Sequence, residues 1–399
     1  MRKVFLFSFF LMVGLIISQF LPQVVGQHYE SVKTVTDTLL YTCLGFIMIN
    51  VGREFEVDKS RWKSYTKDYF IAMATAACPW ILVCLYYIFV LLPSIYWGSS
   101  QAWEENLLLS RFAAPTSAGI LFTMLAAAGL KATWVYKKVQ VLAIFDDLDT
   151  ILLMIPLQIM MVGMKWQLIV IIMVVSILLV IGWKKMGQYN LPQSWQMILL
   201  YAIIIFAATH GIYLGSKILF GLDGGIHIEV LLPAFILGMI MKGNHSHALS
   251  EAKAADTISY LFMLLVGLSM PVFFGIDFAS QTVGAGTVTG SQPVMSWSMI
   301  LFHVVIVSTL SNIGKLVPVF FYRDRRIQER LALSIGMFTR GEVGAGIIFI
   351  ALSYNLGGPA LMISVLTIVF NLILTGIFVV WVEKLTRISY GLDQQAKRD

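Results

Sequence analysis

The sequence predicts an all-α integral membrane protein of about twelve transmembrane helices. Of its 399 residues, 58% are hydrophobic and 13% are charged, with a mean hydropathy of +0.81, whereas a soluble protein carries roughly 25% charged residues. Apolar stretches recur along the whole chain and reach the length of about 20 residues that a helix needs to cross a bilayer core. None alternates as a barrel strand does, and helices satisfy their own backbone groups in lipid.

Twelve apolar stretches, bounded by charged residues, glycine and proline, are expected to span the membrane. They cover 3–21, 35–54, 69–93, 105–130, 137–161, 167–184, 195–216, 226–242, 256–278, 294–321, 329–354 and 358–382. Because no soluble module interrupts the series, we expect one helical bundle.

The distribution of Lys and Arg supports this count and gives an orientation. With both termini on the same side, 22 of the 28 Lys and Arg residues fall on that side, against three (Lys33, Lys165 and Lys217) on the other. Cytoplasmic loops carry such an excess, so we expect a multi-pass protein of the cell (inner) membrane with both termini cytoplasmic. The net charge of +6 is spread over short loops, which argues against nucleic-acid binding.

The first span admits two interpretations. Met1–Lys3 followed by an apolar run is also typical of a signal peptide. Because no small-residue cleavage site follows in 20–26, we expect a retained first helix.

Acidic residues within the fifth span are the strongest functional signal. Asp146 and Asp147 lie about 15 Å from the cytoplasmic end of a helix that rises 1.5 Å per residue, near the bilayer midplane, and Asp149 follows them. A charged group at this depth is costly and indicates a function. Adjacent carboxylates in a low dielectric repel each other, which favours proton uptake by one of them. Such a group can exchange a proton for a cation.

A basic residue within the tenth span could serve these carboxylates. Lys315 has apolar residues on both sides, and Gly314 before it would let a neighbouring helix approach closely. The alternative is that Lys315 extends along the helix to the cytoplasmic interface.

Two spans contain residues that interrupt a helix. Pro115, Thr116 and Ser117 lie in the middle of the fourth, and the segment Thr339–Gly346, with Arg340, Glu342 and three glycines, lies in the middle of the eleventh. Interrupted helices expose backbone groups, which is tolerated where they line a site or are buried in protein.

The order of these spans predicts an inverted repeat. Spans four and eleven are separated by an odd number of crossings and run in opposite directions, each in the middle of a group of three. Corresponding interruptions in two inverted halves mark the binding site of many transporters. For each segment alone, a proline kink or an ion pair of Arg340 with Glu342 or Asp149 remains an alternative.

Taken together, these residues resemble the bacterial sodium/proton antiporters of the cation:proton antiporter superfamily. The resemblance rests on the pair Asp146-Asp147, the break Thr116–Ile120, Gly314-Lys315, and Arg340–Gly344. Weaker similarities occur in Leu44–Glu54 and Pro271–Phe274. It covers most of the chain from about residue 35 onward.

The resemblance implies a homodimer of two-domain protomers that needs no cofactor and is not an enzyme. A core domain of 69–161 and 294–383 would move against a dimerisation domain of 1–55 and 195–278, with 167–184 as a linker helix and 384–399 as a short cytoplasmic tail. It implies electrogenic exchange of Na⁺ or Li⁺ for protons.

The resemblance also implies roles for individual residues. Asp147 would bind the proton and the cation in turn, and Asp146 would pair with Lys315. Thr116 and Ser117 would supply oxygen ligands or shape the crossing.

The chain departs from the family at two points. The polar stretch Pro22–Asp37 stands where the family has a further helix, which puts the dimer contact in doubt. Asp149 and Arg111 have no family role; Asp149 could be a third site carboxylate or the partner of Arg340.

Other function classes fit the residues less well. A sodium-coupled symporter of a small organic anion would share the inverted-repeat architecture, but would need a roomier cavity and no Lys315 partner. A channel favours a symmetric filter or a wide polar lining. An intramembrane aspartyl protease needs carboxylates that face each other from separate helices, and the adjacent aspartates diverge.

Overall fold

The described part of the chain is all helical. The computed structural model describes residues 2–54, 62–162, 166–220, 230–242, 249–270, 287–293, 295–354 and 356–395. No strand occurs among these residues, and one isolated bridge joins Tyr189 to Met241. The α-helices are α1 (Arg2–Val25), α2 (Tyr29–Glu54), α3 (Trp62–Tyr86), α4 (Ser100–Ser110), α5 (Ala118–Ala127), α6 (Trp134–Val162), α7 (Trp166–Lys185), α8 (Trp195–Phe220), α9 (Leu231–Ile240), α10 (Leu249–Leu268), α11 (Trp297–Gly314), α12 (Pro318–Phe321), α13 (Ile327–Gly336), α14 (Glu342–Ser353) and α15 (Gly358–Gln395).

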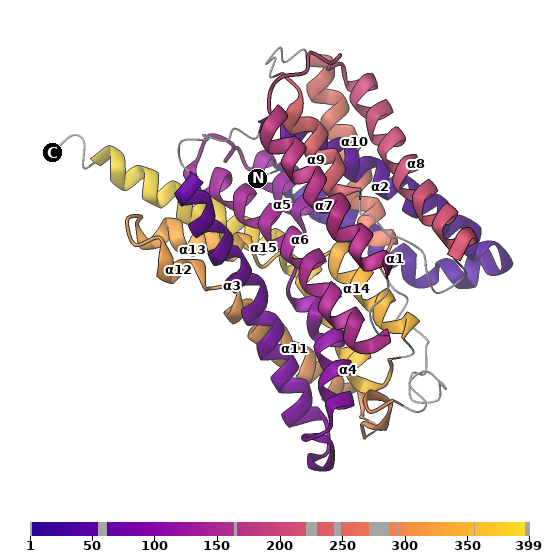
Figure 1. Ribbon diagram of the computed structural model, residues 1–399. Helices are drawn as coiled ribbons and strands as arrows, with labels where there is room; N and C mark the ends of the chain where they lie inside the picture. Colours follow the sequence, from indigo (N-terminus) through magenta and orange to yellow (C-terminus); the bar gives the residue numbers. More distant parts are fainter. Residues whose placement is uncertain are drawn as a thin grey trace.

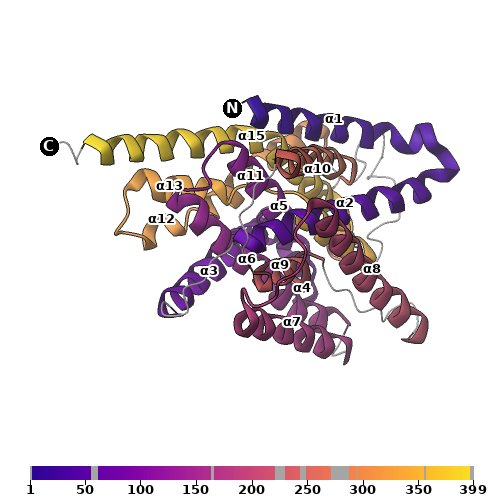
Figure 2. The ribbon, with the colours of Figure 1, turned by 90° about the horizontal axis from the view of Figure 1, so that it is seen from above.

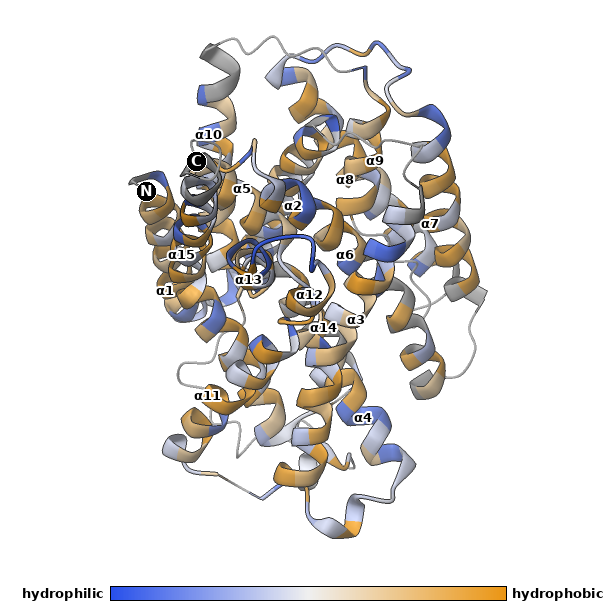
Figure 3. Ribbon diagram, turned by 90° about the vertical axis from the view of Figure 1, so that its left-hand side faces the viewer, coloured by the Kyte–Doolittle hydropathy of each residue, from blue (hydrophilic) through white to orange (hydrophobic). Residues whose placement is uncertain are grey.

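Several of these helices can cross a membrane. Within the described residues, six helical stretches are long and apolar enough by length and composition: Lys3–Arg53, Ser64–Leu91, Ser100–Ala127, Trp195–Ile218, Trp297–Phe321 and Gly358–Gly391. Apolar residues dominate the helices, and the turn between α12 and α13 is hydrophilic (Figure 3). The architecture is that of an all-α membrane protein.

The helices fall into two groups by their packing. One contains α1, α2 and α7–α10, in which α1 packs on α10 and α2 packs on α8 and α9. The other contains α3–α6 and α11–α15, in which α11 lies between α3 and α15 (Figure 1). In the view from above, α7 lies on the side of the molecule opposite α1 and α15 (Figure 2).

Glycines bring helices of the first group into backbone contact. A Cβ on Gly14 of α1 would overlap the Leu264 carbonyl of α10, and one on Gly267 of α10 would overlap the Leu11 carbonyl of α1. The pair Gly52 and Gly238 joins α2 to α9 in the same reciprocal way. Between the groups the contact differs, because Gly119 of α5 faces the side-chain ends of Phe262 and Leu44.

Each expected span coincides with helical structure where its residues are described. Residues 226–229 and 271–278, at the ends of two expected spans, lie outside the described residues. The interruptions in the fourth and eleventh spans are present, because the chain leaves the α-helix between α4 and α5 and between α13 and α14.

Two stretches expected outside the spans are helical. The polar stretch Pro22–Asp37 is taken up by the ends of α1 and α2, around a single turn at Gly26, whose φ is +54°. The hydroxyls of Thr34 and Thr38 donate to carbonyls one turn earlier, which accommodates polar residues within α2. Likewise α15 runs on through most of 384–399, where an ion pair of 2.8 Å between Arg387 and Glu383 spans one turn.

Candidate functional site

The two interrupted segments meet in the second helix group. The first runs from α4 through a 3₁₀ turn, η5 (Arg111–Ala113), to α5, and the second runs from α13 to α14. The Ser117 N–H donates to the Thr339 carbonyl at 3.0 Å, so the two unwound segments are joined main chain to main chain. Beyond this junction, α14 packs on α4 and η5 while α5 and α13 both pack on α6 and α15. Thus α14, the second half of one segment, lies beside α4, the first half of the other. The remaining halves, α5 and α13, share α6 and α15 as neighbours.

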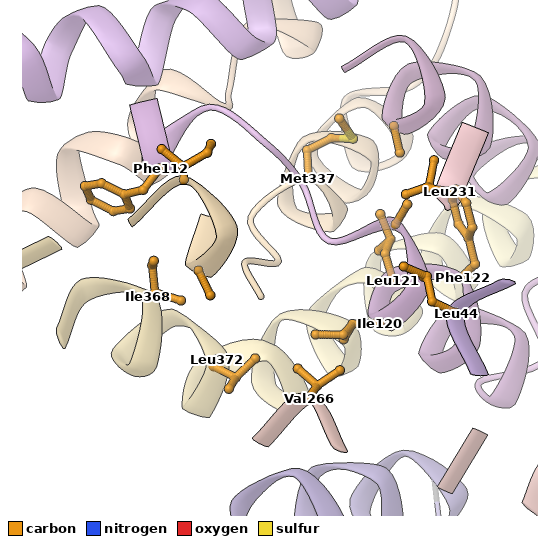
Figure 4. Packing of buried hydrophobic residues seen from close by; sticks show 14 of the residues in the cluster. Leu44, Phe112, Ile120, Leu121, Phe122, Leu231, Val266, Met337, Ile368 and Leu372 are labelled. Carbon is orange, nitrogen blue, oxygen red and sulfur yellow. The ribbon is translucent and has the colours of Figure 1, made fainter. Parts of the chain in front are cut away.

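The sequence explains why the chain unwinds here. Pro115 has no N–H to donate and disfavours the helical conformation of the residue before it. The close approach of the second segment requires a glycine, because a Cβ on Gly341 would lie 2.7 Å from Ile120 Cδ1 and 3.1 Å from Ser117 Oγ. Apolar side chains pack around the crossing, among them Phe112 and Met337, both fully buried (Figure 4).

Asp146 and Lys315 form a fully buried ion pair beside the crossing. Lys315 Nζ lies 2.9 Å from Oδ2 and 3.2 Å from Oδ1 of Asp146, and both side chains are 0% exposed. Thr116 bridges the pair, because its N–H donates to Asp146 at 2.8 Å and its hydroxyl accepts from Lys315 at 3.1 Å. The resemblance implied this pairing, and the geometry leaves no room for Lys315 to extend to the interface.

Asp147 lies next to this pair on α6. Its side chain is buried, and Lys315 lies within electrostatic range of it. Adjacent residues on a helix point about 100° apart, so Asp147 is directed away from the face on which Asp146 meets Lys315. Ser117, which follows Thr116 in the unwound segment, is buried as well.

Arg340 interacts with main-chain carbonyls of the second interruption. It donates to the carbonyls of Met337 and Phe338, at 3.2 and 3.4 Å, and to that of Ser311 on α11 at 3.4 Å. The end of a helix carries unpaired carbonyls and a partial negative charge, so Arg340 stabilises the end of α13. The alternative pairing of Arg340 with Asp149 is not among its contacts; the alternative with Glu342 lies outside the described residues, because the Glu342 side chain is not described.

Asp149 lies one turn beyond Asp146 and contacts a different set of residues. The Tyr69 hydroxyl donates to its carboxylate. Arg111 donates through Nη2 to the backbone carbonyl of Asp149 at 3.0 Å. Of the two possibilities left open by the sequence, pairing with Arg340 is therefore replaced by proximity to Arg111.

The segment that carries Lys315 is held from two sides. On one side Gly314 lies against Pro79 of α3, so closely that a Cβ would come within 2.5 Å of its backbone. On the other side Asn371 of α15 accepts from the Asn312 amide at 3.0 Å and donates to the Ser308 hydroxyl at 3.0 Å. This polar clasp was not anticipated from the sequence.

A further buried carboxylate, Asp68, lies at one end of α3. It accepts hydrogen bonds from Lys138 of α6 at 2.8 Å and from the Tyr322 hydroxyl at 2.7 Å. Burial, together with the neighbouring Asp68 carboxylate, raises the pKa of Tyr322, so its hydroxyl remains a donor. The cluster joins α3 and α6 to the turn that follows α12.

Glu105, like Asp68, is a buried acid that sequence reasoning missed. It accepts from the N–H groups of Val288 and Thr289 at 3.1 and 2.8 Å, and from the Gln101 amide at 2.8 Å. It therefore fastens the short segment before α11 to α4.

Neither the protein-family models nor the curated proteins with which the chain was compared match its sequence.

Proposed function

We propose that the protein is a secondary active transporter that exchanges a monovalent cation, Na⁺ or Li⁺, for protons. The observation that carries the proposal is the buried Asp146–Lys315 ion pair beside Asp147, at the point where two interrupted segments cross. Such a group of charges is costly inside a membrane and is typical of ion and proton pathways. Unwound segments next to it offer backbone and hydroxyl oxygens, which hard monovalent cations favour.

In the proposed mechanism, Asp147 is the carboxylate for which the proton and the cation compete. A deprotonated Asp147 binds the cation together with oxygens from the unwound segment between η5 and α5. The hydroxyls of this segment belong to Thr116 and Ser117. Lys315 holds Asp146 as a carboxylate. When the cation arrives, this pair separates and Lys315 releases its proton, so that two protons, one from Asp147 and one from Lys315, leave for one cation and the exchange is electrogenic. Movement of the second helix group against the first then exposes the site to the other side of the membrane.

The proposal includes an arrangement in the membrane. The chain crosses the cell (inner) membrane about twelve times with both termini cytoplasmic, the spans around α5 and α14 form inverted repeats, and two protomers form a homodimer. The packing of α14, the second half of one interrupted segment, on α4, the first half of the other, supports the repeat, because corresponding breaks in two inverted halves are typical of transporter sites.

The test is proton movement in everted membrane vesicles from a bacterium that lacks its own antiporters. The vesicles are energised, and a pH-sensitive dye reports the internal pH on addition of Na⁺, Li⁺ or K⁺. Asp147→Asn should abolish rapid dequenching, whereas Asp256→Asn, at an exposed ion pair with Lys3, should leave it unchanged.

Two outcomes would count against the proposal. No dequenching with any of the three salts, from mildly acidic to alkaline pH and with the protein confirmed in the membrane, would overturn the exchange of cations for protons. Sodium-dependent uptake of a labelled organic anion in the same vesicles would then identify a symporter. If vesicles with Asp147→Asn dequench as fully as those with the original protein, the protein still exchanges cations for protons, but Asp147 is not the residue that binds them.

A further inference from the structure

Two buried charges next to the site have no part in the proposed exchange. Arg111 lies in η5, directly before the unwound residues of the first interruption, and is 0% exposed. Asp149 lies on α6 one turn beyond Asp146 and is 1% exposed. An uncompensated buried charge costs several kcal/mol, so each of these groups requires an opposite charge nearby.

The contacts of Arg111 place it against three helices. Its Nη2 donates to the Asp149 carbonyl of α6 at 3.0 Å, and its guanidinium lies 4.4 Å from the centroid of the Trp80 ring of α3. The Trp80 indole N–H in turn donates to the Leu107 carbonyl of α4 at 2.7 Å. The guanidinium is therefore fixed in position between α3, α4 and α6.

Both charged groups retain hydrogen-bonding capacity. Among the described residues, Nε and Nη1 of Arg111 and Oδ2 of Asp149 are buried without a hydrogen-bond partner. The Asp149 carboxylate lies next to the Tyr69 hydroxyl, which carries no charge, and within electrostatic range of Asp146, Arg111 and Lys315. Lys315 already pairs with Asp146, so Arg111, which bonds the main-chain carbonyl of Asp149, is the basic residue that remains to balance the Asp149 carboxylate.

These contacts form a second connection between the first interruption and α6. Thr116 bonds Asp146 from one end of the interruption, and Arg111 bonds Asp149 from the other, one helical turn further along. Two attachments one turn apart fix both the position and the rotation of the segment that carries Thr116 and Ser117.

We propose that Arg111 and Asp149 are a charge pair that positions the unwound segment on α6 and keeps Asp149 out of the ion exchange. The positioning role rests on the proposed function, whereas the existence of the pair does not. Asp149 is then a structural counter-charge, and the exchange uses the carboxylate of Asp147.

The first experiment tests the pair without reference to transport. Arg111→Gln, Asp149→Asn and the double variant are purified in detergent, and their thermal unfolding is followed by the loss of monodisperse protein. Each single substitution leaves a buried charge unpaired and should lower the unfolding midpoint or prevent accumulation, while the double variant should regain most of the loss. A double variant no more stable than the worse single variant would overturn the pair, as would single variants with the stability of the original protein.

The second experiment tests the positioning role in the vesicle assay. Arg111→Lys keeps the charge but cannot both stack on Trp80 and reach the Asp149 carbonyl with a planar fork. It should raise the Na⁺ concentration for half-maximal dequenching by about tenfold, the effect of a small misplacement of ligands, with a smaller change in the maximal rate. Arg323→Gln, at an exposed arginine, is the matched control and should change neither. An unchanged half-maximal concentration in Arg111→Lys would overturn the positioning role.

The double variant then decides the role of Asp149. Because it has lost Arg111, it should need as much Na⁺ for half-maximal dequenching as Arg111→Lys, but it should keep the pH profile of the original protein. A displaced pH profile, or loss of exchange in a double variant when Arg111→Gln alone still exchanges, would show that Asp149 takes part in the exchange and would overturn that part of the proposal. If the original protein shows no exchange at all, the proposed function fails, and the unfolding experiment still decides whether the pair exists.

Discussion

Ser117 donates a main-chain hydrogen bond to Thr339, at 3.0 Å, across 222 positions of the sequence. This bond joins the two unwound segments directly, so that each replaces part of the backbone pairing that the other has lost. The absence of a side chain on Gly341 makes the approach possible. The position of the candidate site therefore depends on backbone contacts at the crossing as well as on charged side chains.

Replacement of Lys315 by methionine should destabilise the protein strongly. Lys315→Met leaves the Asp146 carboxylate buried without its counter-charge, and breaking such a pair costs ~3–5 kcal/mol. Lys3→Met is the matched control, because Lys3 is 51% and its partner Asp256 42% exposed, and an exposed pair contributes ~0–1 kcal/mol. Thermal unfolding in detergent measures both, and equal effects would contradict this account of the ion pair.

Replacement of Gly314 by alanine should separate α11 from α3. The new Cβ would lie 2.5 Å from backbone atoms of Pro79, which cannot move as a side chain can, so we expect a loss of about 1–3 kcal/mol and slower cation exchange. Gly215→Ala is the control, because a Cβ there meets nothing within 4 Å. If Gly314→Ala is as stable and as active as Gly215→Ala, the close packing beside Lys315 has no role.

Replacement of Asn371 by leucine should loosen the hold of α15 on α11. The substitution removes the bonds to Asn312 and Ser308, and each buried polar group left without a partner costs about 1–3 kcal/mol. Lys315 follows directly on this part of α11, so the exchange rate should fall together with stability. Thr375→Val is the control, since the Thr375 hydroxyl bonds only within α15, to the Asn371 carbonyl. Equal losses of stability and exchange rate in both variants would contradict the role of Asn371 in holding α15 to α11.

The sequence predicted the helices and the two interruptions because each depends on local residues. Runs of apolar residues define the spans, and Pro115 and Gly341 lie where the helices are interrupted, although Gly344 and Gly346 lie within α14. That Asp146 and Lys315 each need an opposite charge nearby was also predictable, because a charge in an apolar span needs a partner. Their pairing across 169 positions followed only from the resemblance.

Other contacts left no such signal. Tyr69 looks like any aromatic residue of an apolar span, and its bond to Asp149 depends on how α3 packs on α6. The four-residue spacing of Ser308 and Asn312 could have indicated one polar face of α11, but Asn371, the residue that joins them, is known only from the packing of α15. The bonds of Arg340 to the carbonyls of Met337, Phe338 and Ser311 also left no signal, because any residue carries a main-chain carbonyl.

The glycine contacts have a mechanical consequence. Where backbone meets backbone, as at Gly14 with Gly267 and at Gly52 with Gly238, no change of rotamer can accommodate a shift, so these joints are stiff. At Gly119 the contact is different, because the backbone of α5 meets the end of the Phe262 side chain and not another backbone. Shear motions are small sliding movements of packed helices. The backbone contacts thus hold α1 to α10 and α2 to α9 rigidly. A small shift of the second helix group relative to the first would be accommodated more easily at α5, where a side chain forms the contact.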